Sequence, residues 1–252
     1  MEIADNMLHR HRRVLNRRLG GLVQSVNNRA YLQGGTTVLT PSPDARSGRY
    51  QLSFTFGGLL IPETLTIAEA YQDLQEWPGV RRRMIDESGL QKTRRRTAQR
   101  YFREIKVRLE HAYPWERELI VGDSPQDRAV VLYVVFTRYY RLVGDFVTQV
   151  VRERHLSGLA TVDTAMFRSF MADQAPAHPE LSGVSDTTAA KLAEVALRVM
   201  REASLLSGGR APFRTAPPSV SAEMRRKYCL QGNMEDLAHL LWSDKEIAPC
   251  LQ

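Results

Sequence analysis

The segment from Thr93 to His111 constrains the fold most, because its apolar residues recur at the spacing of one helix face. The recurring residues are Ala98, Tyr101, Phe102, Ile105, Leu109 and Ala112. Spacings of three and four residues predict an α-helix that buries one side. Thr93 is a suitable N-cap residue, so we expect the helix to run from there to about His111.

Arginine occupies the side of this predicted helix that faces away from the apolar stripe. Arg96, Arg100 and Arg103 share that side through their spacing of four and three residues. The wider segment 78–108 holds eleven basic and only three acidic residues. The alternative is a solvated charged helix, but such helices normally interleave Glu with Arg. The scarcity of acids favours a polyanionic partner, nucleic acid first and an anionic membrane second.

The charge of the whole chain points the same way. The net charge is +7, and thirty of the 35 basic residues are arginine, whose planar fork suits phosphate. Residues 113–252 hold sixteen basic and seventeen acidic residues, so the excess lies before them. We therefore predict contacts to double-stranded DNA. The predicted DNA-binding residues are Arg81, Arg82, Lys92, Thr93, Arg94, Arg95, Arg96, Arg100, Arg103, Lys106, Arg210 and Arg214.

The N-terminal half beyond residue 49 is expected to be helical. After a short extended segment over 50–56, Pro62 begins a helix over about 62–76. A second helix over 78–87 is expected to end at Gly89 in a left-handed conformation. With the basic helix these form three short helices, which is typical of a helix-turn-helix-like unit. The match is imperfect, since a usually apolar position falls on Arg95.

Cap residues mark the helices of the central part. Ser124 is predicted to cap a buried helix that breaks near Gly144 and ends before Gly158. Asp163 is predicted to cap a shorter helix that reaches about Ala172. This part is therefore expected to form a helical bundle.

The C-terminal part is expected to combine helices with a hairpin. Residues 176–185 are predicted to form a loop, and a helix follows over 187–206. The segment Gly208–Arg214 is typical of a hairpin tip, and a final helix is expected over 234–242. A helix followed by a basic hairpin predicts a winged-helix-like unit with a short β-hairpin.

These patterns predict a mainly α-helical protein in four parts. The parts are a basic N-terminal extension (1–48), a helix-turn-helix-like basic unit (49–112), a central helical bundle (113–180) and a winged-helix-like C-terminal unit (181–252). The extension has two interpretations: a basic amphipathic helix over about 5–19, or a poorly ordered, flexible tail.

Several protein classes are not expected. The longest strongly apolar run, Ala129–Phe136, has eight residues, far fewer than the roughly twenty that span a bilayer. The Arg-rich N-terminus lacks the apolar stretch of a signal peptide. Cys229 and Cys250 are too few for a disulfide framework or a thiolate zinc site, so a reducing, cytoplasmic compartment is expected.

No catalytic, metal-binding or cofactor-binding residue is predicted, and we expect a protein that is not an enzyme. Phosphate-binding loops, dinucleotide-binding loops and metal-binding His or Cys motifs are absent from the sequence. Asp86, Glu104 and Lys106 have the spacing of a metal-dependent nuclease site. That chemistry needs Glu104 and Lys106 on a strand, whereas the periodicity places them on a helix.

Particular segments of the sequence resemble the BrxA family of BREX phage-defence systems. The matching segments are Ser53–Thr55, Gly57–Glu63, Trp77, Gln91–Arg94, Arg100–Ile105 and Arg201–Leu206. The match extends to Tyr140, Leu142, Asp145, Phe146, Arg152–Glu153 and His178–Leu181. Arg141 and Gly144 depart from it, because Pro and Arg are expected there.

The resemblance implies a mostly helical bacterial protein that binds double-stranded DNA without enzymatic activity in a multi-protein antiviral defence system. With the charge pattern, it predicts an accessory DNA-binding protein that is largely indifferent to base sequence. Other BREX proteins are the expected partners. The alternative is a protein-interaction adaptor whose Arg-rich face docks on an acidic surface of another BREX component.

Overall fold

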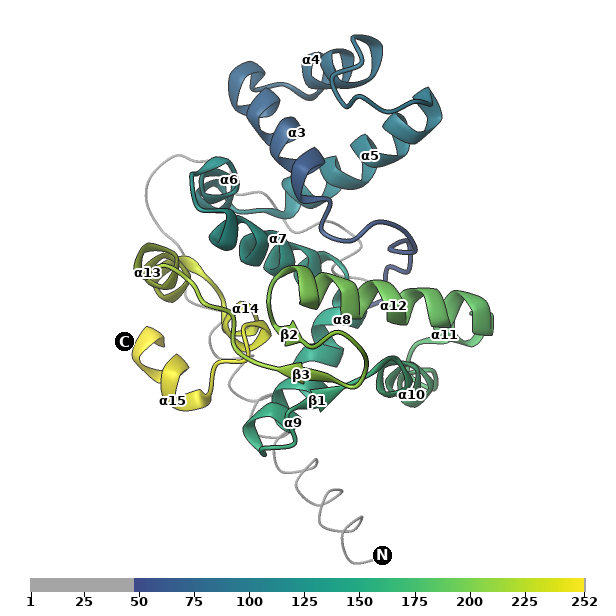
Figure 1. Ribbon diagram of the computed structural model, residues 1–252, viewed down its shortest axis with the longest axis vertical. Helices are drawn as coiled ribbons and strands as arrows, with labels where there is room; N and C mark the ends of the chain where they lie inside the picture. The colour runs from purple at the N-terminus through teal and green to yellow at the C-terminus, as the bar shows by residue number, and fades with distance from the viewer. Residues whose placement is uncertain (1–47, 252) are drawn as a thin grey trace, which may run out of the picture. The chain divides into compact units, whose positions relative to one another are not determined.

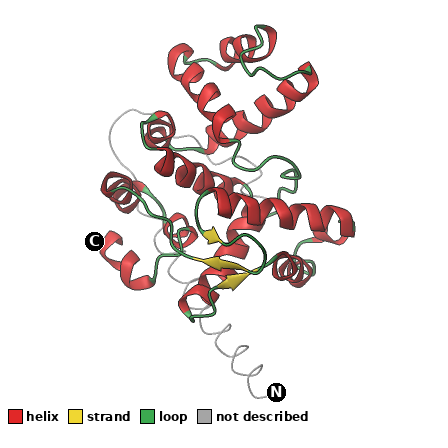
Figure 2. Ribbon diagram, viewed as in Figure 1, coloured by secondary structure: helices red, strands yellow, loops and turns green. Residues whose placement is uncertain are grey.

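The computed structural model describes residues 48–251, most of which lie in α-helices (Figures 1 and 2). The strands in this range form one small antiparallel sheet. The mainly α-helical fold class is therefore confirmed. Both interpretations of the N-terminal extension concern residues outside the described part of the chain.

The first group of helices contains the basic segment. It comprises α3 (Ile61–Leu74), α4 (Trp77–Arg81), a π-helical turn (Arg82–Asp86), α5 (Arg95–His111) and α6 (Pro114–Val121). The predicted helix over 62–76 is α3, and the one over 78–87 is α4 with its π-helical continuation. Residues 50–55 before them have no regular secondary structure and pair with no strand.

Two details of the turn before α5 were predicted wrongly. Gly89 does not take a left-handed conformation; Ser88 does, with φ 60°. Gly89 is closely packed instead, because a Cβ there would lie 2.7 Å from the carbonyl oxygen of Arg83. The N-cap of α5 is Arg94 rather than Thr93, and its side chain makes no capping hydrogen bond.

The central group contains the most buried helix. It comprises α7 (Pro125–Tyr139), α8 (Arg141–Phe146), a π-helical turn (Val147–Arg152) and α9 (Glu153–Leu156). The Ser124 cap is confirmed, since its Oγ accepts a hydrogen bond of 3.1 Å from the backbone of Asp127. Every side chain of 129–137 is buried, so α7 lies within the core.

The break in this helix falls at Tyr140 and not at Gly144. Tyr140 has φ −93° and ψ 73°, which ends α7 before α8 begins. Gly144 lies inside α8, where a Cβ would be 2.8 Å from Nε2 of His239. Close packing therefore accounts for the glycine, and leaves no room for the arginine that the family resemblance leads one to expect.

The next group joins helices to the sheet. It comprises β1 (Thr161–Val162), α10 (Thr164–Gln174), α11 (Pro179–Ser182), α12 (Asp186–Glu202), β2 (Leu206–Ser207) and β3 (Phe213–Thr215). The Asp163 cap is confirmed by a 2.9 Å hydrogen bond from the backbone of Met166. One-turn helix α11 lies in the predicted loop, and α12 ends four residues earlier than predicted.

The predicted hairpin is present as β2 and β3, but it has a third strand. Strand β3 lies between β1 and β2, with Arg214 opposite Thr161 on one side and Ser207 on the other. The pairing to β1, the strand that follows α9, joins the hairpin to the segment of chain that leaves the central group (Figure 1). Strand β1 was not predicted because a two-residue strand leaves no period-two pattern.

The last group is α13 (Ala222–Gln231), α14 (Met234–His239), α15 (Asp244–Ile247) and a 3₁₀ turn (Ala248–Leu251). Helix α13 was not predicted, and the predicted helix over 234–242 is the shorter α14. Cys229 and Cys250 are joined by a disulfide, which their separation of 21 residues did not reveal. Among the described helices, none is long and apolar enough to cross a bilayer.

A buried ionic cluster holds α6, α7 and α14 together. Arg138 of α7 donates to both oxygens of Glu116 at 2.9 and 2.8 Å and to both oxygens of Asp236 at 3.2 and 2.8 Å. It also donates to the carbonyl oxygen of His111 at 2.9 Å, and Tyr228 donates to Glu116 at 2.9 Å. All five N–H groups of the guanidinium are thus satisfied.

Candidate nucleic-acid interface

Helix α5 has the two faces that its sequence predicts. Ala98, Phe102, Ile105 and Leu109 are buried against the core, whereas Arg96, Arg100 and Arg103 are exposed. No acidic residue lies in the first turn of the helix. The helix therefore presents uncompensated positive charge on the side away from the core.

Five exposed arginines of this region have no carboxylate partner within residues 48–251, and we call them the α5 basic face. They are Arg82, Arg94, Arg96, Arg100 and Arg103. The helix pair α4–α5 brings cations from both helices together, since Arg81 and Arg103 line one hollow of about 270 Å³. Gln99 and Phe102 form part of the same wall.

Four predicted residues of the basic segment are instead paired with acids. Lys92 Nζ lies 2.7 Å from Glu63 and 4.6 Å from the centre of the Tyr101 ring. Arg95 and Arg81 both pair with Asp86, at 2.6 and 3.8 Å. Lys92 lies in the turn before α5 and Glu63 lies on α3, while Arg95 and Asp86 belong to different helices, so helical spacing could not reveal these two pairs.

The other two predicted residues of the basic segment are Lys106 and Thr93. Lys106 lies 3.5 Å from Glu110, one turn further along α5. The Thr93 side chain is exposed just before the helix begins. Four of the twelve predicted residues are thus at least partly neutralised by neighbouring carboxylates.

The loop before α3 connects α5 to the rest of the molecule. The Arg100 guanidinium lies 3.7 Å from the centre of the Phe56 ring. Buried Arg108 donates to the carbonyl oxygen of Gly58 at 2.8 Å and to Glu104 at 2.9 Å. Arginines on a single helix therefore have different roles: Arg108 fixes the loop, whereas Arg100 covers it from outside.

The two arginines predicted near residue 212 lie on a different element. Arg210 is exposed in the β2–β3 connection, and Arg214 is exposed on β3. Figure 1 shows the hairpin separated from α4 and α5, so the structure does not bring these two arginines together with the α5 basic face.

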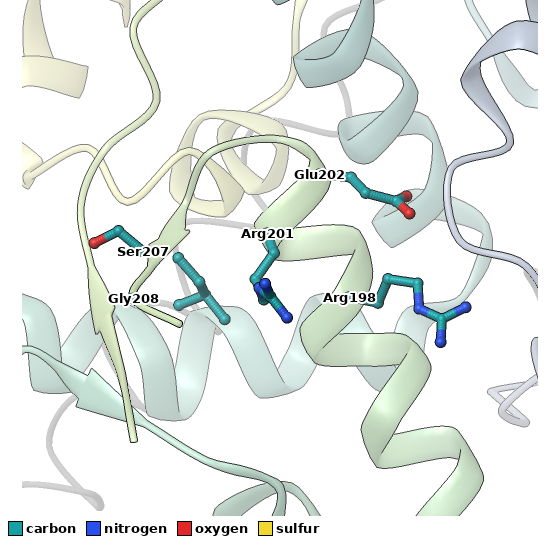
Figure 3. A pocket seen from close by; sticks show the side chains of 6 residues that line it. Arg198, Arg201, Glu202, Ser207 and Gly208 are labelled. Atoms are coloured by element: carbon teal, nitrogen blue, oxygen red, sulfur yellow. The ribbon is translucent and has the colours of Figure 1, made fainter. Parts of the chain in front are cut away.

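A second cationic hollow was missed by the sequence analysis. Arg198 and Arg201 of α12 line a depression of about 560 Å³ together with Glu202, Leu206, Ser207 and Gly208 (Figure 3). Their spacing of three residues on one helix was a usable signal. It was overlooked because α12 also carries acids and belongs to the charge-balanced part of the chain.

The residues with nuclease-like spacing are engaged in other contacts. Glu104 and Lys106 lie on α5, as predicted, and Glu104 accepts hydrogen bonds from Tyr140 and Arg108. Asp86 is paired with Arg95. Across residues 48–251, no group of three or more His, Cys, Asp or Glu side chains could hold a metal ion.

Comparison with known proteins identifies the family. The sequence model of the BrxA family matches residues 48–228. A relative named BREX protein BrxA, from Escherichia coli O9:H4 (strain HS), is 27% identical over 150 residues, which are 58% of this chain and 69% of the relative.

A solved structure supports the fold. It is the crystal structure of an uncharacterized protein from Magnetospirillum magneticum, with a TM-score of 0.67 and 20% identity. The similarity covers 76% of this chain and 98% of that one, and at this identity it concerns the fold alone. The family match covers all the helices of the candidate interface and most of the described residues, and the chain therefore belongs to the BrxA family.

Proposed function

We propose that this protein is a double-stranded DNA-binding accessory component of a BREX phage-defence system and that it has no catalytic activity. The supporting observation is the α5 basic face, with five exposed arginines that have no carboxylate partner in the described structure. An arginine that is neither buried nor paired gains little from its place in the fold. A phosphate would supply the strong bidentate partner that the guanidinium lacks.

The composition of the face supports binding that is largely independent of base sequence. Base-specific readout of adenine uses Asn or Gln side chains in the major groove. Gln99 is the only amide residue on α5, and it is half buried in the wall of the hollow between Arg81 and Arg103. The face is therefore suited to phosphates, which fix position without specifying sequence.

The helix-turn-helix-like and winged-helix-like arrangements remain predictions. Helices α4 and α5 with the exposed turn between them support the first, and the β2–β3 hairpin after α12 supports the second. On this proposal α5 would lie along or within a groove. Its positive N-terminal end, which lacks an acidic side chain, would then face the DNA.

The test compares three proteins by fluorescence anisotropy with random-sequence duplex DNA over a series of salt concentrations. The α5 variant is R96Q/R100Q/R103Q, which keeps side-chain length and helix propensity. The matched control is R168Q/R226Q/K245Q, which removes three exposed cations that also lack carboxylate partners in the described structure. Both variants lose the same net charge.

We expect the wild-type protein to bind the duplex with an affinity that falls steeply with salt. In the α5 variant the slope of log affinity against log salt should be shallower by about 2.7, because each phosphate contact contributes about 0.9. Affinity at low salt should fall by about ten- to a thousandfold, at roughly 0.5–1.5 kcal/mol per contact. The control should keep the wild-type slope within about 0.5.

Three results would contradict the proposal or a part of it. If the wild-type protein bound no duplex at low salt but captured a purified BREX protein, the α5 basic face would belong to the adaptor instead. If the slope of log affinity against log salt became shallower in the control and kept its wild-type value in the α5 variant, DNA would bind elsewhere on the molecule. A thousandfold preference for one sequence over random duplex would refute sequence-tolerant binding.

A further inference from the structure

The hollow at the end of α12 presents two arginine side chains to the solvent. Arg198 and Arg201 project from successive turns of the helix, and both are exposed (Figure 3). Glu202, Leu206, Ser207 and Gly208 complete the wall, and Ser207 and Gly208 are exposed. With a volume of about 560 Å³, the hollow is large enough for a phosphate group and its neighbouring sugar.

Two acids lie at or near this hollow. Glu202 lines it, and its carboxylate also accepts a 2.6 Å hydrogen bond from the backbone of Leu59 in the loop before α3. Glu194, one turn before Arg198, is paired with Lys191 at 2.8 Å, and its pKa is lowered by Lys191 and also by the nearby charge of Arg198. Residues 203–219 contain two arginines and no acid. Two arginines and one carboxylate therefore line the hollow, and the formal charge of its lining stays positive.

The structural roles of the two arginines leave their charge available. Arg198 donates to the carbonyl oxygen of Gly57 at 2.7 Å, which uses one of its five N–H groups. The Arg201 guanidinium lies 4.9 Å from the centre of the Phe213 ring and in the last turn of α12, where a cation stabilises the helix. Neither contact involves a carboxylate.

The hollow and the α5 basic face each have an arginine that contacts the loop before α3, at two adjacent residues. Arg100 covers the ring of Phe56, and Arg198 binds the carbonyl oxygen of Gly57. Neighbouring Cα atoms are about 3.8 Å apart, so the two guanidinium groups approach the same short stretch of chain. A DNA strand advances about 3.4 Å per nucleotide, so one strand reaches from Arg100 to Arg198 within a few phosphates.

We infer that Arg198 and Arg201 form a second phosphate-binding point for the same DNA duplex that contacts α5. This inference rests on the proposed function, and it extends the DNA path from α5 across the Phe56–Gly57 loop onto α12. Arg210 and Arg214, on the hairpin that follows, lie beyond the hollow along the chain. The ligand at the hollow is a phosphodiester group of duplex DNA, read by charge and not by base.

The test uses the full chain in the anisotropy assay, with R198Q/R201Q as the main variant. The matched control is R168Q/R226Q, which removes two exposed arginines that lack carboxylate partners in the described structure. A third protein, R198K/R201K, keeps both charges. We expect R198Q/R201Q to have a slope shallower by about 1.8 and an affinity lower by about five- to a hundredfold at low salt. The control and R198K/R201K should stay within about 0.5 of the wild-type slope.

A second measurement does not depend on affinity. Backbone hydrogen exchange across residues 198–208 should slow when saturating duplex is added to the wild-type protein. R201Q breaks no hydrogen bond, so it replaces the double variant if loss of the Arg198 bond to Gly57 unfolds the protein. Its slope should fall by about 0.9, against no change for R168Q.

The possible failures are distinguishable. If wild-type protein binds no duplex, the proposed function fails, and the inference fails with it. If wild-type protein binds duplex and R198Q/R201Q has the same salt slope as R168Q/R226Q, phosphate binding at Arg198 and Arg201 is refuted. Binding through α5 then stands. If the α12 variant loses an acidic protein partner but keeps the wild-type DNA slope, the hollow is a protein-docking site and the inference is overturned.

Discussion

Replacing Arg138 by Met should destabilise the fold strongly, because it leaves two buried carboxylates facing each other. The Glu116 side chain is fully buried and that of Asp236 is 1% exposed. In the native protein the guanidinium supplies five hydrogen bonds to this cluster, four of them to the two carboxylates. Methionine fills a similar volume and supplies none.

The size of the effect follows from removing the cation of a buried ion pair while its two carboxylates remain. Removing one partner costs about 3–5 kcal/mol, because the remaining charge stays buried and unpaired. The total stability of a domain is only about 5–15 kcal/mol. A domain of this length loses roughly 2–4 °C of melting temperature per kcal/mol, so R138M should melt about 6–20 °C below wild type.

The assay is thermal and urea unfolding followed by far-UV circular dichroism at pH 7 and at pH 5. The deficit of R138M should shrink at the lower pH, because protonation removes the repulsion between the two carboxylates. The double variant R138M/E116Q should recover part of the loss. The control R83Q removes a pair with Asp73 whose side chains are 48% and 63% exposed, so it should cost less than about 1 kcal/mol. Melting of R138M within 2 °C of wild type would refute the reasoning.

Two further predictions concern His239 and Gly58. Burial, and then the charge of Arg138, lower the pKa of His239 to about 3, so the folded protein resists protonation that the unfolded chain accepts below about pH 6.5. The free energy of unfolding should therefore decrease as pH falls below about 6.5. Between pH 7 and pH 5, urea unfolding should show that H239N loses about 2 kcal/mol less of this free energy than wild type does. A Cβ at Gly58 would lie 2.5 Å from both carboxylate oxygens of Glu202, so G58A should break the Glu202 bond to Leu59 and cost about 1.5–3 kcal/mol in the same assay. G183A, where no atom lies within 4 Å of the added Cβ, is its control and should change stability by less than about 0.5 kcal/mol.

The features that the sequence predicts well are local ones. The α5 stripe and the caps at Ser124 and Asp163 depend on residues within one or two helical turns, and the structure confirms them. The break between α7 and α8 at Tyr140 depends on packing between distant segments. The same is true of the glycine at position 144, which lies against His239. Helix α13 was missed because its buried residues, Met224 and Tyr228, make only a weak stripe among polar neighbours.

The candidate site also combines local features that the sequence predicts with long-range contacts that it does not. Exposure of Arg96, Arg100 and Arg103 follows from helical spacing, and the structure confirms it. The pairing of Lys92 with Glu63, 29 positions away, follows from how α3 packs near α5 and has no signal in one sequence. The contact between Arg198 and Gly57 spans 141 positions. Periodicity within one helix cannot reveal such a contact, so it could not connect the α12 hollow to α5.

The preference for arginine over lysine has two physical causes in this protein, and only one concerns the proposed contact with DNA. Arg128 donates to the carbonyl oxygens of Ile120 and Gly122 at 2.6 Å each, and so satisfies the C-terminal end of α6. Arg152 donates in the same way to Trp242 at 2.9 Å. Such bonds use the planar fork of N–H groups that lysine lacks, so arginine is favoured inside the fold as well as at phosphates.

Net charge alone therefore overstates the proposed DNA-binding surface. An arginine that binds backbone carbonyls or buried carboxylates adds to the formal charge, but its guanidinium is already occupied. The two kinds separate by burial and by partner: Arg108 and Arg138 are held by several acceptors, whereas Arg96 and Arg103 have none within the described residues. It is this second kind, concentrated on α5 and continued by Arg201 on α12, that can neutralise phosphates without any cost to the fold.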